Sequence, residues 1–374
     1  MTNGAEARMA SYLKRIATGP EMSTNLTRDE ARDGMTLILT GRVDPAQAAV
    51  FLIALRMKRE SDDENLGVLD ALRETTHTAI ADVPDLVDLA DPYDGFLRHL
   101  PAAPFLPAVL AACGVPTISH GCRAMGPKFG LTHHQILNVA GVRVDLAPEE
   151  ANAHIINPLL GWAYIDQAAF HPELHGLIEL RRLIVKRPCL STLEKLCGPV
   201  RASGRTHVVV GYVHSAYERL LPLVAREAGY ASALVIRGVE GGVIPPLNAQ
   251  TRVISYRPGE ADESWKLSPR EAGIESELRA APLASAPDQA AADESFDEAS
   301  QERDLSSLAA RAAEAGIDAL RGKAGPTRDS LVLAAAVILR QVGRAASLTE
   351  SADLARRAID SGEARRRFLA LSRG

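Results

Sequence analysis

A glycine-rich basic stretch holds the residue types best suited to binding an anion. An apolar run stops at Gly114, and residues 115–118 are expected to form a short buried strand. The stretch that follows contains His120, Gly121, Arg123, Gly126, Lys128 and Gly130. Glycine N–H groups and fixed positive charge at the carboxyl end of a strand bind phosphates and carboxylates. Glycines after a strand can also serve only the turn, and single basic side chains are often solvated, so both interpretations stay open.

The composition bounds the class of protein. The chain has 374 residues, of which 46% are hydrophobic and 4% aromatic. Such a chain is long enough for two or three domains or for one large α/β domain, with an aliphatic and largely helical core. The net charge of −5 gives no general reason to bind nucleic acid, although a local basic stripe could do so.

The cysteines and the apolar runs indicate where in the cell the protein is expected. The four cysteines show no zinc-like spacing with histidine, and free thiols are expected. The sequence shows no charged and apolar leader, and no apolar run is long enough to span a bilayer. We therefore expect a cytoplasmic protein that does not contact a membrane.

Residues 1–80 have the pattern of an all-helical domain. Helix-start signals occur as a capping box at Thr27–Glu30 and as an Asp-Pro pair at Asp44–Pro45. Residues 46–57 are apolar on nearly all sides, so their helix is expected at the centre of the domain. Residues 62–74 are more polar, and their helix is expected on the outside.

Residues 81–374 are expected to form an α/β domain. Residues 81–107 form a long segment rich in Asp and Pro that is expected to be irregular. Beyond it, short apolar runs alternate with helical patterns, which is typical of β-α-β units and a mainly parallel sheet. The expected strands include residues 142–146, 162–165, 207–212, 233–237 and 252–256. Residues 258–304 lack periodicity and are expected to be a mobile acidic excursion.

Six short strings, spread over nearly the whole chain, carry a family pattern. They are residues 27–41, 48–58, 112–116 together with 120–123, 198–199, 325–329 and 343–347. In number, order and spacing they resemble the anthranilate phosphoribosyltransferases, which belong to the glycosyltransferase family 3 and nucleoside phosphorylase group.

The resemblance implies a small helical N-terminal domain beside a larger α/β domain with a mainly parallel sheet, as in phosphoribosyltransferases and nucleoside phosphorylases. The cleft between them would bind phosphoribosyl pyrophosphate with Mg²⁺, and helical faces would pair in a homodimer. In that reaction the ribosyl carbon gains oxocarbenium character as diphosphate leaves and a nitrogen nucleophile attacks. Catalysis then depends mostly on positioning and on charge stabilisation.

The family motifs map onto this sequence with substitutions. In the diphosphate loop Asp94 and Gly95 match, whereas Phe96 and Leu97 stand where bare backbone is expected. The other candidate ligand residues are Arg98, His120, Gly121, Arg123, Lys128, and Arg182 at the position that contacts the aromatic acid. Of the acidic pair that holds magnesium, only Glu240 remains, and a single carboxylate is a poor Mg²⁺ anchor unless substrate phosphates supply other ligands.

These substitutions resemble a divergent branch of the family, some of whose members are taken to bind nucleic acid. The sequence therefore predicts a divergent phosphoribosyltransferase that uses a phosphorylated ribosyl donor, or another anionic ligand, with an unknown acceptor. No catalytic residue is assigned. The alternative is a non-catalytic nucleic-acid-binding protein on the same fold. Its basic surface would comprise Arg181, Arg182, Lys186, Arg187 and Lys195, facing Arg98, His99, Arg123 and Lys128, although a solvated face explains the first group equally well.

Overall fold

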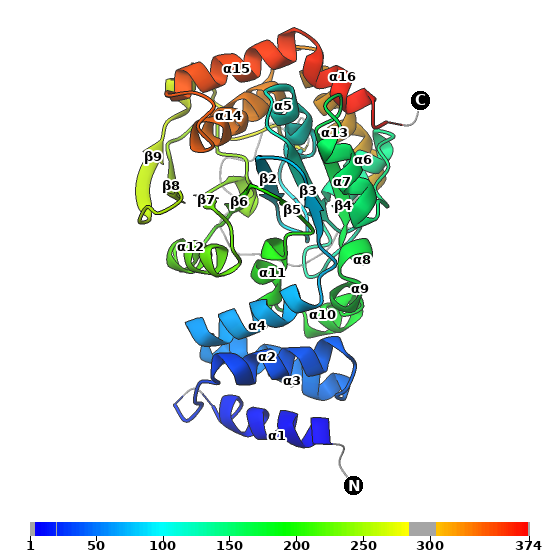
Figure 1. Cartoon of the computed structure of the whole chain (residues 1–374), viewed down its shortest axis with the longest axis vertical. Helices are drawn as coiled ribbons and strands as arrows, with labels where there is room; N and C mark the ends of the chain where they lie inside the picture. Colours follow the sequence, from blue (N-terminus) through cyan, green and yellow to red (C-terminus); the bar gives the residue numbers. More distant parts are fainter. Residues whose placement is uncertain (1–3, 20, 284–303, 373–374) are drawn as a thin grey trace.

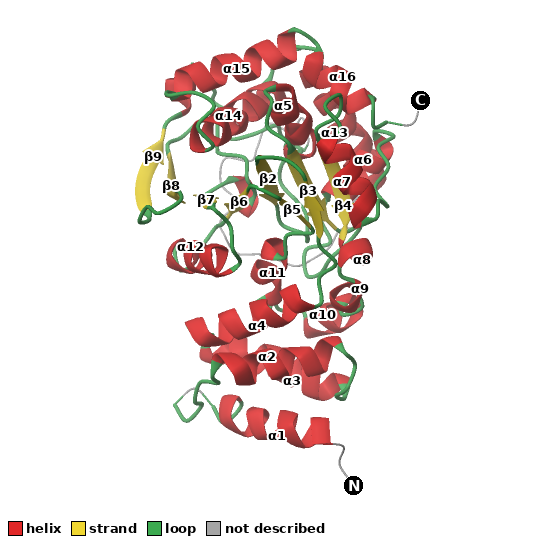
Figure 2. Ribbon diagram, in the orientation of Figure 1, coloured by secondary structure: helices red, strands yellow, loops and turns green. Residues whose placement is uncertain are grey.

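The computed structural model describes residues 4–19, 21–283 and 304–372. Figure 1 shows an elongated molecule, with the N-terminal helices at one end of its long axis and the C-terminal helices at the other. The strands lie between these ends, nearer to the C-terminal helices (Figure 2). No helix within the described ranges is long and apolar enough to cross a membrane.

Four helices form the N-terminal layer, namely α1 (Gly4–Ile16), α2 (Arg28–Leu39), α3 (Pro45–Lys58) and α4 (Asp62–Glu74). The expected start signals of two of them are confirmed. Thr27 and Glu30 bond reciprocally in a capping box before α2, and Asp44 accepts the N–H of Ala46 at 2.7 Å. These side chains satisfy backbone N–H groups that have no partner inside the helix.

The expected positions of α3 and α4 are wrong. The buried helix is α4, because it packs on α2 and on two helices of the α/β part, α11 (Leu190–Leu193) and α12 (Tyr217–Glu227). In contrast, α3 buries one face and leaves Val50 and Met57 exposed, at 44% and 72%. An apolar helix therefore lies at the surface of the N-terminal layer.

The main sheet has seven strands in the order β4-β3-β2-β6-β7-β8-β9, and the first five are parallel. Their bounds are β2 Asp85–Ala90, β3 Thr117–Gly121, β4 Trp162–Asp166, β6 Arg205–Gly211, β7 Ser232–Ile236, β8 Thr251–Tyr256 and β9 Glu263–Leu267. A separate parallel pair is formed by β1 (Ala79–Ala81) and β5 (Val200–Ala202). The predicted α/β class with a mainly parallel sheet is confirmed.

Helices cover both faces of the sheet. Alternate residues of β2 enter different cores: Leu86 and Ala90 join a core that continues into α2–α4, whereas Val87 and Leu89 join one formed with the C-terminal helices. The remaining α-helices are α5 Leu106–Ala112, α6 His133–Val139, α7 Pro148–Ile156, α8 Gln167–Phe170, α9 Pro172–His175, α10 Ile178–Ile184, α13 Leu305–Leu320, α14 Pro326–Gln341, α15 Leu348–Asp360 and α16 Glu363–Leu369. Burial on both faces is what parallel sheets require.

The central strand β2 lies inside residues 81–107, which contradicts the expectation that this segment is irregular throughout. Asp88 interrupts the apolar residues of the strand, yet it is fully buried. Its carboxylate pairs with His120 Nε2 at 2.7 Å and accepts the Tyr230 hydroxyl at 2.6 Å. A buried carboxylate is tolerated only with such partners, and they explain why an acidic residue sits mid-strand.

Two other expectations for the α/β part differ from the structure. Residues 142–146 form no regular strand, only an isolated bridge at Val142. Part of the expected acidic excursion is ordered, because β9 pairs with β8 in antiparallel fashion. Residues 284–303 of that excursion lie outside the described residues.

Gly67 of α4 packs directly against α2. A Cβ atom on Gly67 would lie 2.1 Å from the carbonyl oxygen of Arg28, a backbone atom that cannot turn aside. We expect Gly67→Ala to lower the free energy of unfolding by about 1–3 kcal/mol, measured by urea unfolding. Gly4→Ala is the control, since nothing lies within 4 Å of the corresponding Cβ atom. Equal stability of the two variants would contradict this packing.

Candidate functional site

Three loops meet at the carboxyl ends of parallel strands. They are the β2 loop (residues 91–99), the β3 loop (residues 122–131) and the β7 loop (residues 237–243). Phe96 and Leu131 exchange backbone hydrogen bonds of 3.0 and 2.9 Å, and the Val243 N–H donates to Asp91 Oδ1 at 2.6 Å. The carboxyl edge of a parallel sheet is where α/β proteins bind ligands, so this junction is the candidate site.

The glycines of the junction bring backbones together. Gly95 has a φ of +76°, and a Cβ atom on it would lie 2.6 Å from the carbonyl carbon of Gly130. The Gly130 N–H donates to the Asp94 carbonyl at 2.9 Å. A Cβ atom on Gly121 would lie 3.2 Å from the Tyr164 hydroxyl. The glycines thus serve the close packing of the loops, and the N–H groups of Gly95 and Gly130 donate to carbonyls within them. A contact of Gly121 with a ligand stays a prediction.

The amides that hold an anion lie at residues 97–99 of the β2 loop. Glu240 of the β7 loop places its carboxylate there: Oε2 accepts the Leu97 N–H at 2.9 Å, and Oε1 accepts the Arg98 and His99 N–H groups at 2.9 and 3.0 Å. The His99 ring adds a contact of 3.2 Å through Nδ1. Burial opposes the charge, but the His99 ring and the backbone donors hold the pKa of Glu240 below its ordinary value.

The Glu240 carboxylate does not offer an unused oxygen to a magnesium ion. Its Oε2 accepts the Leu97 N–H and its Oε1 the Arg98 N–H, while Asp94 Oδ2 accepts from Arg187 at 2.7 Å. Carboxylate oxygens that ligate Mg²⁺ must be available to the ion. Among the described residues no group of three or more metal-binding side chains is found. Glu240 therefore binds backbone amides rather than offering a metal ligand.

Lys128 and Arg187 hold the loops together from within. Lys128 Nζ donates to the Gly95 carbonyl at 3.1 Å, and its side chain is only 8% exposed. Arg187, which follows α10, donates from Nε to Asp94. Both cations thus fix the turn of the β2 loop, and the structure gives them an internal role in place of the expected contact with a ligand.

His120 is buried beneath the β2 loop. Its Nε2 pairs with Asp88, and its Nδ1 accepts the Tyr93 hydroxyl. Burial raises the pKa of Tyr93, so the hydroxyl stays protonated and donates a hydrogen bond to the ring nitrogen. With 1% of its surface exposed, His120 supports the loop and does not face a ligand.

The basic surface expected around α10 is not assembled. Arg181 is buried in an ion pair with Glu194, with N–O distances of 2.6 and 2.9 Å, and Lys195 is buried as well. Arg182 is exposed but pairs with Glu179 at 2.6 Å. Two of the five cations are therefore removed from solvent, which contradicts a continuous surface for nucleic acid.

Exposed cations do occur at the rim of the junction. Arg123 of the β3 loop and Lys186 after α10 are exposed. Sequence reasoning missed two others, Arg237 and Arg279, which approach from the β7 loop and from the segment after β9. Burial and the neighbouring Arg237 lower the pKa of Arg279, whereas Glu240 opposes the shift, so these three side chains lie within electrostatic reach of one another.

Lys195 lies at the carboxyl end of β6, where its Nζ donates to the Gly211 carbonyl at 3.1 Å. Burial lowers the pKa of Lys195 to about 8, although Asp91, Asp94 and Glu194 favour the charge. Because the ordinary lysine pKa is 10.5, the folded protein bears the full cost of this buried charge below pH 8. That cost disappears as the pH rises toward 10.5, so the contribution of Lys195 to stability improves with pH.

We expect Lys195→Met to stabilise the protein relative to the wild type more at pH 7 than at pH 10. The difference between the two pH values should be about 1–3 kcal/mol in the free energy of unfolding, measured with urea. The exposed Lys266 of β9 provides the control, since Lys266→Met should show no such dependence. If Lys195→Met changed the free energy of unfolding equally at both pH values, Lys195 would not carry a destabilising buried charge.

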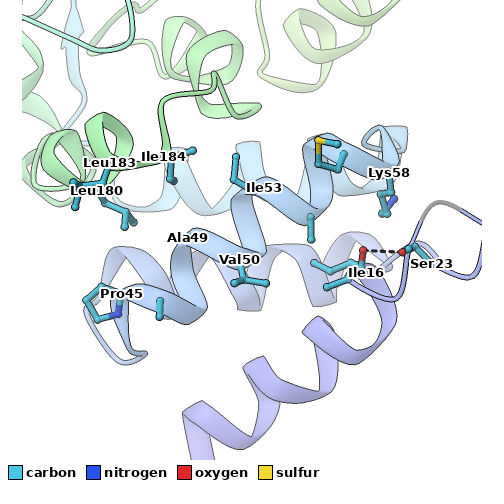
Figure 3. Close-up of a pocket in the computed structure, with 15 residues that line it drawn as sticks. Ile16, Ser23, Pro45, Ala49, Val50, Ile53, Lys58, Leu180, Leu183 and Ile184 are labelled. Atoms are coloured by element: carbon cyan, nitrogen blue, oxygen red, sulfur yellow. Dashed lines mark hydrogen bonds between the residues drawn. The ribbon is translucent and has the colours of Figure 1, made fainter.

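A cavity of about 710 Å³ lies away from the junction, on the N-terminal layer (Figure 3). Its walls come from α1, α3 and α10, and its labelled apolar residues include Ile16, Val50, Ile53, Leu180, Leu183 and Ile184. This wall chemistry suits contact with another apolar surface and not an anionic ligand. The junction at the sheet edge remains the candidate site.

Comparison with known proteins agrees with the fold. Residues 10–76 match the helical bundle domain of a glycosyl transferase family, and residues 104–365 match its a/b domain. The anthranilate phosphoribosyltransferase of Methylobacterium nodulans is 30% identical over 354 residues, 95% of each chain. The enzyme of Symbiobacterium thermophilum is 29% identical and covers 96% of this chain and 95% of its own.

Two solved structures share the architecture. Anthranilate phosphoribosyltransferase from Thermus thermophilus aligns with a TM-score of 0.72 at 22% identity, over 97% of this chain and 99% of its own. The Saccharomyces cerevisiae enzyme, solved in complex with PRPP and Mg, aligns with a TM-score of 0.74 at 16% identity, over 98% and 97%. The chain belongs to the glycosyl transferase family that includes these anthranilate phosphoribosyltransferases.

Proposed function

We propose that the protein is a phosphoribosyltransferase of the anthranilate phosphoribosyltransferase type, which uses a phosphorylated ribosyl donor and an unknown acceptor. One observation carries this proposal: the loops at the carboxyl edge of the sheet converge on backbone amides that hold an anion, residues 97–99. The similarity over nearly the whole chain supports the reaction class.

The rim of the junction supplies what this reaction needs from the protein. As the bond to the leaving phosphate breaks, negative charge grows on the leaving group and positive charge on the ribosyl carbon. Arg123 is exposed on the β3 loop, and its side chain has no ion-pair partner within the part of the chain that the structure describes, so it can meet the phosphate charge. Helices α4 and α11 lie between the sheet and the rest of the N-terminal layer (Figure 1), so the layer supplies the opposite wall that orients the donor.

Binding of magnesium to this chain would depend on the phosphates of the donor. The yeast relative was solved with PRPP and Mg. Here Glu240 and Asp94 already accept N–H groups, so the phosphates of the donor would supply most of the oxygens around the ion.

Binding of phosphoribosyl pyrophosphate tests the proposal. We expect isothermal titration calorimetry with the donor, at constant ionic strength, to show binding that Arg123→Ala weakens at least tenfold, because the lost guanidinium would contact phosphate (about 1.4 kcal/mol). Arg366→Ala is the matched control, since Arg366 is 58% exposed on α16, which packs on α5 away from the junction. Absence of binding at millimolar donor would exclude the transferase.

The apolar cavity of Figure 3 supports a second part of the proposal, a homodimer formed through the N-terminal layer. Val50 and Leu183 line this cavity and are 44% and 63% exposed, and Met57 beside them is 72% exposed. A second copy of the same face would remove these side chains from water.

Sedimentation velocity tests the dimer. We expect the wild type to sediment as a dimer and Val50→Asp as a monomer, because a charge would be buried in the interface. Val139→Asp serves as the control, since Val139 of α6 is 47% exposed but lies outside the cavity. A wild type that sediments as a monomer at micromolar concentration would refute this interface.

A further inference from the structure

We propose that Glu240 fills an anion site of its own protein, and that a phosphate-class anion binds to residues 97–99 by displacing the Glu240 carboxylate. The inference deepens the proposed function and rests on it only in taking the natural anion to be the phosphate of the donor. In this inference Glu240 does not bind a metal ion. Its carboxylate instead occupies the position that the phosphate of a ligand would take.

The donors around Glu240 match the acceptors of a phosphate group. Three successive backbone N–H groups, those of Leu97, Arg98 and His99, converge on its two oxygens at 2.9 to 3.0 Å, and the His99 ring stands at 3.2 Å. Successive amides that point to one anion form a nest, which binds phosphate and carboxylate alike. The Glu240 side chain is 10% exposed, and that of His99 19%, so the nest borders on solvent.

Several cations lie within electrostatic reach of Glu240 and the nest. Lys128 lowers the pKa of Glu240, and Arg98, Arg237 and Glu240 all act on Arg279. A phosphate or diphosphate would bring two or more charges to the same place. The cluster of cations therefore favours a more highly charged anion over the resident carboxylate.

The backbone turn at Glu240 does not depend on where its carboxylate lies. The φ and ψ of Glu240 are 51° and 24°, the left-handed region that a residue with a Cβ atom seldom adopts. Backbone hydrogen bonds hold this turn without the carboxylate, since the Gly242 N–H donates to the Val239 carbonyl at 2.9 Å. The turn can therefore keep its shape when the Glu240 side chain leaves the nest.

Two variants separate the carboxylate from the nest. Glu240→Gln keeps the shape of the side chain without its charge, and Glu240→Gly opens the nest while suiting the left-handed backbone. Inorganic pyrophosphate is titrated by calorimetry into wild type and variants, in EDTA and at fixed ionic strength. We expect at least tenfold tighter binding by Glu240→Gly and a smaller gain by Glu240→Gln, with melting temperatures rising in parallel on addition of pyrophosphate.

Glu260→Gln is the control, because Glu260 is exposed in the turn between β8 and β9 and should leave the affinity unchanged. Unchanged or weaker binding by the folded Glu240→Gly variant overturns the inference, and weaker binding restores a ligand-binding role for the carboxylate. The measurement needs neither acceptor nor turnover. Failure of the proposed function would appear as a wild type that binds no donor, whether or not pyrophosphate affinity rises in Glu240→Gly.

Discussion

A buried carboxylate must find donors, and this constraint organises the centre of the molecule. Asp88, Asp91, Asp94 and Glu194 are all less than 9% exposed, and each is met by a residue from a different loop or strand. Removing such a charge from water costs several kcal/mol unless hydrogen bonds replace the lost solvent. Each acid therefore ties two segments together, and the loops at the sheet edge are joined by these ties as much as by apolar contact.

The same constraint explains how far the sequence could predict the fold. Strands with continuous apolar runs, such as β6 and β7, and helices with capping boxes, such as α2, were predictable because local pattern and tertiary role agree. The strand β2 could not be recognised, since the partners that make Asp88 tolerable lie 32 and 142 residues away. Similarly, the apolar pattern of α3 could not predict its exposed face. That face depends on which neighbouring helices pack against α3, and apolar periodicity does not determine this.

The fold brings three of the predicted site residues to one edge of the sheet. Gly95, Arg123 and Glu240 follow β2, β3 and β7, whose carboxyl ends share that edge because the strands are parallel. The type of a side chain does not show where the backbone N–H group of its residue points. Leu97 was therefore counted against an anion site, although its own N–H group donates to the Glu240 carboxylate. Lys128 and His120 were expected at the ligand because of their charge and polarity, but burial directs both toward internal partners.

The chain leaves the N-terminal layer through β1, which leads into β2, and β5 leads from α11 into β6. These two strands pair in register through Ala79, Ile80 and Ala81. Because paired strands cannot slide past each other without breaking their ladder, this small ribbon fixes the start of β2 relative to the start of β6. The position of the helical layer along the strand direction is thereby tied to the register of the sheet.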